Sequence, residues 1–187
     1  VLELILKSEN KVIALARSTD KLSRLLEIAK GLNPECSLFP VQFDLLNDDI
    51  EQGLKPFIAQ QFGQLDVLIN NAGSLDVKPF AESSEVDFVE MLQSNFLNHV
   101  RLIQGLLPLM QSPSHIVNIG SMGGFQGSAK FAGLSAYSAS KAALHNLTEC
   151  LAEELKERKI SVNCLALGSA QTEMLEKAFP GYESPVM

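Results

Sequence analysis

The sequence predicts an α/β protein built on a doubly wound parallel sheet with helices on both faces. Short apolar runs typical of buried strands alternate with longer segments in which apolar residues recur every three to four positions. Glycines stand where two of these helical segments would end, and no linker or repeat interrupts the alternation. Strands that alternate with helices form parallel sheets through right-handed crossovers. We therefore expect one domain over residues 1–187.

Each element can be placed from its pattern. Strands are predicted over residues 11–16, 38–44, 65–71, 115–120 and 160–167, and helices over residues 20–31, 47–62, 85–110 and 137–159. The opening residues look like the end of a helix, so a strand is expected before them. In the Rossmann-like strand order 3-2-1-4-5-6 that strand is central. We expect this first strand, and a C-terminal strand, to lie outside the given sequence.

Composition narrows the class of function. The chain is 46% hydrophobic and 20% charged, which is enough apolar material for one sizeable core. Its net charge of -7 argues against binding to nucleic acid or to anionic membranes. Cys36, Cys150 and Cys164 lack the spacing of a metal site and are interpreted as reduced thiols. We expect a cytoplasmic protein that acts on small molecules, with no metal and no membrane span.

The strongest local signal is a tyrosine and a lysine near the start of the last long helix. Tyr137 and Lys141 are four residues apart, so their side chains share one helical face. A tyrosine has an ordinary pKa near 10, and a neighbouring cation that favours the phenolate brings its proton within reach of acid/base chemistry. This spacing is weak evidence by itself, because it is common on helix surfaces.

Two further segments end in small or polar residues at the expected carboxyl edge of the sheet. The strand that ends at Gly120 is followed by Ser121, and an earlier strand runs through Asn70 and Asn71 into Ala72 and Gly73. Ligands of open α/β sheets bind at this edge, and small residues let a flat ligand approach the backbone. The simpler interpretation of the second segment is a tight turn.

Taken together, these motifs resemble the short-chain dehydrogenase/reductase family. The turn from Asn70 to Gly73, Asn95 in a long helix, Ser121, and the Tyr137/Lys141 pair occur in that family's order, and the resemblance spans essentially the whole chain. It implies hydride transfer between a nicotinamide cofactor and a carbonyl or secondary alcohol, with Tyr137 as general acid/base.

The resemblance also implies roles for the other residues. Lys141 would lower the tyrosine pKa and bind the nicotinamide ribose, Ser121 would donate to the substrate oxygen, and Asn95 would hold a water. Cofactor contacts are implied for Tyr137, for Lys141 and for seven further positions: Asp44, Leu45, Asn71, Ala72, Gly73, Gly168 and Thr172.

The cofactor is expected to be NADP(H), with NAD less favoured. The second strand of a Rossmann-type domain ends beside the adenosine ribose, where an NAD enzyme usually places a carboxylate. Here Ala16 is followed by Arg17 and Ser18. A planar cation and a hydroxyl suit a 2′-phosphate. The alternative is that Arg17 simply points to solvent.

The sequence departs from the family pattern in four places. The glycine-rich phosphate-binding loop lies outside the sequence, Gly120 replaces the first residue of a common Ser-Ser pair, Leu167 replaces a proline, and the loop over residues 123–136 is long. The first departure leaves the pyrophosphate cradle unassigned.

Three hypotheses follow. The first is an active carbonyl reductase or alcohol dehydrogenase, including a 3-oxoacyl reductase-like enzyme, working as a homodimer or homotetramer through the helices over residues 85–110 and 137–159. The second is a non-catalytic nicotinamide-nucleotide-binding scaffold or redox sensor. The third is a truncated piece that cannot fold alone. Among 3-oxoacyl thioesters, sugars, sterols and xenobiotic ketones, the sequence selects no substrate.

Overall fold

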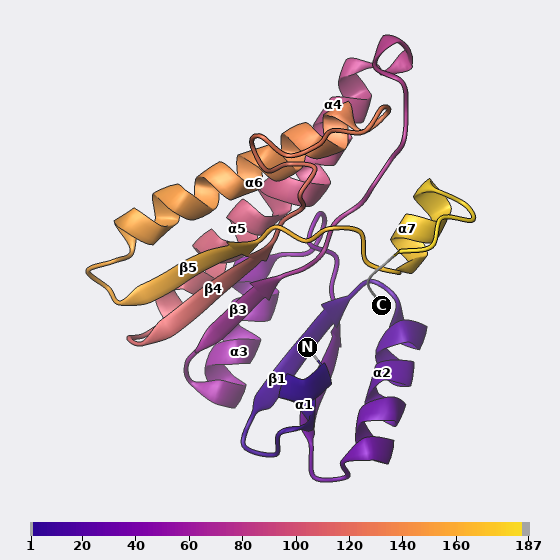
Figure 1. Cartoon of the computed structure of the whole chain (residues 1–187). Coiled ribbons are helices and arrows are strands. Elements are labelled where there is room, and N and C mark those ends of the chain that lie inside the picture. The colour runs from indigo at the N-terminus through magenta and orange to yellow at the C-terminus, as the bar shows by residue number, and fades with distance from the viewer. Residues whose placement is uncertain (1, 185–187) are drawn as a thin grey trace. The chain divides into compact units, whose positions relative to one another are not determined.

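The chain folds into two compact units, residues 1–49 and residues 50–187, in a computed structural model that describes residues 2–184. Each unit has its own parallel sheet, in the order β1-β2 and β3-β4-β5. If the expected preceding strand is counted as strand 1, β1 and β2 are strands 2 and 3 of the predicted order 3-2-1-4-5-6, and β3, β4 and β5 are strands 4, 5 and 6. The α/β fold class is confirmed. Figure 1 shows the strands and the helices that accompany them.

The first unit is a β-α-β arrangement with a short helix before it. Its elements are α1 (Leu2–Leu6), β1 (Lys11–Ala16), α2 (Thr19–Leu32) and β2 (Ser37–Gln42). β1 and β2 pair in parallel from Lys11 opposite Ser37 to Ala16 opposite Gln42. Ile5, Ala29, Cys36 and Leu38 form its buried core. The predicted helix at the start is confirmed for residues 2–6, whereas Val1 lies outside the described residues.

The second unit carries a three-stranded sheet. Its strands are β3 (Val67–Asn70), β4 (Ser114–Ile119) and β5 (Ile160–Leu165), all parallel. Its helices are η1 (Ile50–Leu54), α3 (Lys55–Phe62), η2 (Phe80–Glu82), α4 (Glu85–Leu92), η3 (Gln93–Leu97), α5 (Asn98–Leu106), η4 (Leu107–Leu109), α6 (Ser135–Glu154) and α7 (Glu173–Ala178). α6 packs on β4, on β5 and against α4, and α4, α5 and α6 form a layer along one face of this sheet (Figure 1).

A buried polar chain ties β3, β4 and α6 together. Asn70 Nδ2 donates to Asn118 Oδ1 at 2.8 Å, and Asn118 Nδ2 donates to Thr148 Oγ1 at 2.9 Å. Thr148 in turn donates to the carbonyl of Leu144 at 2.7 Å. Burying an amide costs free energy unless it is hydrogen-bonded, so this series of hydrogen bonds fixes the register of the two strands against the helix. It lies directly below the strand ends that carry the candidate site.

The predicted elements are confirmed in type, and their bounds shift by a few residues. The largest difference lies in the helix predicted over residues 85–110, which the structure divides at a π-helical turn over residues 93–97. The turn holds Asn95. Apolar spacing cannot reveal it, because a π-turn adds one residue to a turn and leaves the flanking pattern helical.

Arg158 lies just beyond the C-terminal end of α6. Glu154 and Arg158 are spaced to pair on one helix, but α6 ends at Glu154. Arg158 instead donates from Nη2 to the carbonyls of Leu107 at 3.1 Å and Met110 at 3.3 Å. Leu107 begins η4 and Met110 follows its last residue, so Arg158 supplies a side-chain donor to carbonyls of this short helix and its C-cap.

Candidate active site

Ser121 is presented just beyond the carboxyl end of β4. Residues 120–122 continue the pairing of β4 with β5 through two more backbone hydrogen bonds. Gly120 N donates to the Leu165 carbonyl at 2.9 Å, and Met122 N donates to the Leu167 carbonyl at 2.8 Å. The chain then turns, and Gly124 N donates to the carbonyl of Ser121 at 3.0 Å. The serine is therefore held on a short, well-bonded backbone segment rather than on a free loop.

Tyr137 lies in the first turn of α6, close to Ser121. The two side chains are hydrogen-bonded, which lowers the tyrosine pKa, but burial outweighs this and raises the pKa of Tyr137 above its ordinary value of 10.0. A side-chain carbon placed on Gly123 would lie 3.4 Å from Ser121 Oγ and 3.9 Å from Tyr137 Cε1. Gly123 therefore lies beside both side chains. At neutral pH the phenol is protonated.

Lys141 is buried one helical turn further on. Only 5% of the residue is exposed, and its Nζ donates to the carbonyl of Ile119 at 2.9 Å. Burial lowers the pKa of the ammonium, with a smaller opposing influence from nearby Cys164. The expected lowering of the Tyr137 pKa by Lys141 is not among the influences on that tyrosine. The ammonium instead donates a hydrogen bond to the last residue of β4.

Asn95 is fully buried in the π-helical turn. Its Oδ1 accepts from Ser74 N at 2.9 Å, and its Nδ2 donates to the Ser74 carbonyl and to Ser140 Oγ, both at 3.0 Å. Ser140 belongs to α6, between Tyr137 and Lys141, and donates to the Tyr137 carbonyl at 2.7 Å. The direct partners of the amide are thus protein groups that join the turn after β3 to the start of α6.

Gly73 marks the point where these groups meet. A side-chain carbon placed there would lie 2.6 Å from Asn95 Oδ1 and 3.6 Å from Lys141 Nζ. Contacts below 3.0 Å are essentially never seen for such carbons, so glycine is required. Asn71, Ala72 and Gly73 themselves are exposed, which leaves their backbone open to a ligand.

His99 holds the carbonyl side of this turn. Its Nε2 lies 2.7 Å from the Ala72 carbonyl, and its Nδ1 has no partner among the described residues. Burial lowers the pKa of His99 to about 4, so the ring is neutral and donates from Nε2. The motifs identified in the sequence do not include His99. Its spacing of four residues from Asn95 was the available signal for a position beside the site.

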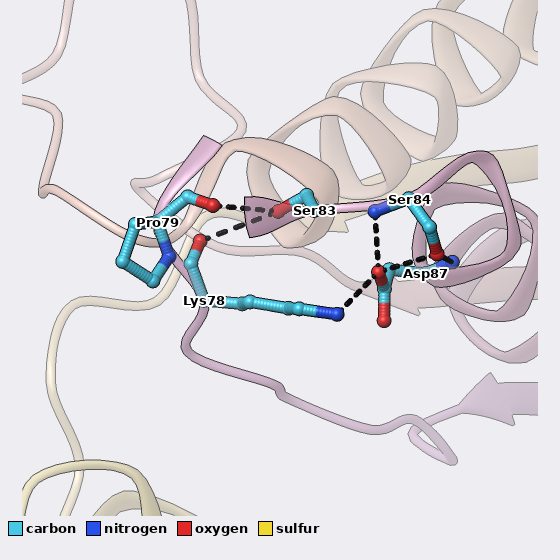
Figure 2. Close-up of polar contacts among 5 residues, drawn as sticks. All are labelled: Lys78, Pro79, Ser83, Ser84 and Asp87. Atoms are coloured by element: carbon cyan, nitrogen blue, oxygen red, sulfur yellow. Dashed lines mark hydrogen bonds and ion pairs between the residues drawn. The ribbon is translucent and has the colours of Figure 1, made fainter. Parts of the chain in front are cut away.

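The loop after Gly73 is anchored to α4 by a group of side chains shown in Figure 2. Lys78 Nζ lies 2.7 Å from Asp87 Oδ2, and the same oxygen accepts from Ser84 N and Ser84 Oγ at 2.6 and 2.7 Å. Lys78 N also donates to the carbonyl of Gly133 at 2.9 Å, in the loop before α6. The two loops that follow β3 and β4 are therefore joined to each other on this side of the site.

Arg17, Ser18, Asp44 and Leu45, predicted at the adenosine end of the cofactor, lie in the first unit, whereas residues 71–73, predicted along the adenosine and ribose side, lie in the second. An open cavity of about 410 Å³ is lined by Arg17, Gln42, Asp44 and Asp48. Hydrogen bonds from Leu46 N and Asn47 lower the pKa of the Asp44 carboxyl, and Arg17 adds to this.

Two neighbouring positions have structural partners of their own. Ser18 caps α2, because its Oγ accepts from Lys21 N at 3.2 Å. Leu45, half-buried beside Asp44, has interactions of its own within the chain.

The segment after β5 carries the last predicted residues. Leu167 N donates to the carbonyl of Leu165 at 3.0 Å, a bond that the proline of the family pattern could not make. Gly168 is exposed with open space around it. Thr172 caps α7, since its Oγ1 accepts from Leu175 N at 3.2 Å. The structure thus brings Asn95, Ser121, Tyr137 and Lys141 together and leaves Gly168 and Thr172 on an exposed segment.

Within residues 2–184, no helix is long and apolar enough to cross a membrane. The same part of the chain holds no group of three or more His, Cys, Asp or Glu side chains arranged to bind a metal ion.

Comparison with known proteins identifies relatives of the whole chain. Residues 1–183 match the family model described as short chain dehydrogenase. The chain is 35% identical over 176 residues to the oxidoreductase YciK of Escherichia coli K12, which covers 90% of this chain and 67% of that protein. It is 32% identical over 168 residues to a fatty acyl-CoA reductase of Acinetobacter baylyi, covering 88% of this chain and 55% of that protein.

Solved structures agree with these relatives. A short chain dehydrogenase from Escherichia coli CFT073, complexed with NADPH, has a TM-score of 0.83 and 32% identity to this chain, over 92% of this chain and 72% of that one. The chain spans only 55–65% of the length of three of the curated relatives that it matches.

Proposed function

Because the chain belongs to the short-chain dehydrogenase/reductase family, we propose that it carries the active site of an oxidoreductase that transfers a hydride between NADP(H) and a carbonyl or secondary alcohol. One observation supports this most. Ser121 and Tyr137 are hydrogen-bonded at the carboxyl end of β4, and Lys141 is buried one turn beyond the tyrosine on the same helix. This is where ligands of open α/β sheets bind.

The proton chemistry follows from the state of these groups. Bound nicotinamide would supply the hydride. Tyr137, kept protonated by burial, is placed to donate its proton to a carbonyl oxygen during reduction. Ser121 is placed to donate a hydrogen bond to the same oxygen as negative charge develops there. In the reverse direction the phenol must first lose its proton, so that the phenolate can accept the proton of the alcohol.

The residues present fit a dinucleotide. Gly73 leaves free the space that any side chain would fill beside Asn95 and Lys141, and the backbone of Asn71 and Ala72 next to it is exposed. Lys141 would hold the nicotinamide ribose, and Gly168 and Thr172 would contact the nicotinamide end. In the first unit, the cavity beside Arg17 suits an adenosine ribose that carries a 2′-phosphate, because guanidinium groups bind phosphate through several donors.

The substrate we propose is a carbonyl compound with an apolar chain, of the kind that a 3-oxoacyl reductase-like enzyme reduces. The loop after Ser121 supports this, because it exposes three large apolar side chains: Met122, Phe125 and Phe131. Exposed apolar groups beside a polar reaction centre are typical of pockets for such substrates.

The test is turnover by the full-length protein. We expect oxidation of the reduced cofactor, followed by its absorbance, with NADPH and at least one aliphatic or 3-oxoacyl carbonyl in a panel that also contains sugars and sterols. Cofactor binding without turnover on any carbonyl would contradict the proposal and support the nucleotide-binding scaffold instead.

We also propose that the protein works in the cytoplasm as a homodimer or homotetramer. The exposed side chains of Val86 and Val89 on α4 support an interface there. Leu144, an apolar residue of α6, is fully buried within the chain and does not contribute. Three free cysteines suit a reducing compartment. Light scattering of the full-length protein that found only monomer at micromolar concentration would refute the oligomer.

A further inference from the structure

His145 occupies the third position of a row on α6. It follows Tyr137 and Lys141 at intervals of four residues, so all three lie along one face of the helix. The proposed chemistry uses only the first two. The histidine is half-buried.

The ring of His145 contacts the backbone of Ser121 directly. Its Nε2 lies 3.1 Å from the Ser121 carbonyl oxygen and 3.4 Å from the Ser121 amide nitrogen. The amides of Gly120 and Met122, on either side, both donate to the segment of β5 and its extension. The Ser121 amide, between them, points instead toward Nε2 of His145 on α6.

The space for this ring exists because residue 120 is glycine. A side-chain carbon on Gly120 would lie 2.7 Å from His145 Nε2, 2.9 Å from its Cε1 and 2.6 Å from Cys164 Sγ. None of these distances is tolerable for a real side chain. Gly120 and His145 are therefore complementary, and a serine at position 120 would displace the ring from the Ser121 backbone.

The ring of His145 also packs against Phe125. His145 and Phe125 meet edge to face, with ring centroids 5.8 Å apart and an interplanar angle of 71°. Phe125 belongs to the turn that follows Ser121, and its amide donates to the Met122 carbonyl at 3.1 Å. The imidazole thus contacts both the Ser121 backbone and the turn beyond it, which leaves the serine little freedom to rotate.

We propose that His145 is a positioning residue that fixes the Ser121 backbone and so aims the Ser121 hydroxyl at the reacting oxygen. This proposal rests on the proposed function of Ser121. Small displacements of an oriented group lower a rate steeply, so loss of the imidazole contacts should reduce kcat without weakening cofactor binding.

The test compares two substitutions in the full-length protein. His145→Leu removes the ring nitrogen, which donates to the Ser121 carbonyl in one tautomer and accepts from the Ser121 amide in the other. His145→Gln keeps a donor and an acceptor at the end of the side chain. We expect kcat to fall about tenfold or more in His145→Leu and to return to within about threefold of wild type in His145→Gln, while the NADPH dissociation constant stays within about twofold in both. The matched control is His115→Leu, because His115 Nε2 contacts Asn163 Oδ1 at 2.7 Å near the opposite end of β4. It should leave kcat unchanged.

A second arm separates positioning from a general loss of structure. In a Ser121→Ala background the effect of His145→Leu on kcat should shrink to within about twofold, because the group that His145 aims is gone. A full effect in that background, or wild-type kcat in His145→Leu, would overturn the proposal.

A third arm does not depend on turnover. Hydrogen exchange of peptides spanning residues 119–125 should be faster in His145→Leu than in wild type and in His115→Leu. If wild type reduces no carbonyl but this exchange difference is present, the proposed function fails while the contact itself stands. Unchanged exchange in His145→Leu would overturn the positioning role.

Discussion

The two regions predicted to bind and to transform ligands are built differently. Around Tyr137 the polar groups are buried and bonded to one another: Lys141 is 5% exposed, and Asn95 is fully buried with three protein partners within 3.0 Å. Around Arg17 the polar groups are exposed beside an open cavity. Proton transfer needs groups held in fixed positions and at shifted pKa values, whereas recognition of a phosphate needs a cation within reach.

This difference predicts distinct responses to substitution. Changes in the buried region should alter turnover or stability strongly, and a change at the exposed cation should alter the choice of cofactor and little else. The following variants test the contrast.

Replacing Lys141 should have the largest effect outside the tyrosine. Lys141→Met removes an ammonium that donates to the Ile119 carbonyl and that we assign to the ribose. We expect kcat to fall at least about a hundredfold and NADPH affinity about tenfold, measured by steady-state kinetics and by fluorescence titration. A normal affinity with a low kcat would separate the two roles, and a kcat within a few-fold of wild type would exclude both.

His99 should make stability depend on pH. Its pKa is about 4 in the folded chain and 6.5 ordinarily, so below about pH 6.5 the unfolded chain binds a proton that the folded chain does not. Stability is therefore fully present above that pH and is lost as the pH falls toward about 4. This amounts to about 2 kcal/mol by about pH 5.

Urea unfolding of wild type and His99→Gln at about pH 8 and about pH 5 would measure this contribution. The wild type should lose about 2 kcal/mol more than the variant between the two pH values. Equal losses would show that the buried ring has no part in acid destabilisation.

The two glycines at positions 73 and 31 form a matched pair across the regions. Gly73→Ala places a carbon 2.6 Å from Asn95 Oδ1, whereas Gly31→Ala in α2 meets nothing within 4 Å. We expect Gly73→Ala to lower the free energy of unfolding by about 1–3 kcal/mol and to reduce kcat. Gly31→Ala should raise stability by about 0.5–1 kcal/mol, because alanine favours a helix. A stable, fully active Gly73→Ala protein would show that the turn is looser than described.

Arg17 should produce the smallest and most selective effect. Arg17→Ala is expected to lower kcat/KM for NADPH at least about tenfold, or about 1.4 kcal/mol, and to spare NADH. The reason is that only the 2′-phosphate loses its cation. Equal efficiency of the wild type with the two cofactors would contradict the assignment.

The sequence was sufficient to predict the alternating elements and the grouping of Ser121, Tyr137 and Lys141. The order of the motifs, which resembles that of a known family, predicts this grouping, and the shared edge of parallel strands and the shared helix face of residues four apart agree with it. The position of Arg17 directly after an apolar run placed it at the end of β1. These predictions depend on patterns that can be read along the sequence.

Contacts across elements were not predictable in the same way. The π-turn that buries Asn95 leaves no mark in the apolar pattern, and the fit of His145 into the space above Gly120 depends on the separation of α6 and β4. The pKa of Tyr137 also differed from expectation, because it depends on how deeply the ring is buried. Such features need the packed structure, since side-chain volume and desolvation decide them.

The most direct test of the central claim is to measure turnover and binding together in Tyr137→Phe. Only the hydroxyl hydrogen-bonded to Ser121 is removed, and the ring and Lys141 stay in place. We expect kcat to fall at least about a thousandfold while the NADPH dissociation constant stays within about twofold of wild type. Turnover within a few-fold of wild type would contradict the assignment of Tyr137 as the proton-transfer residue.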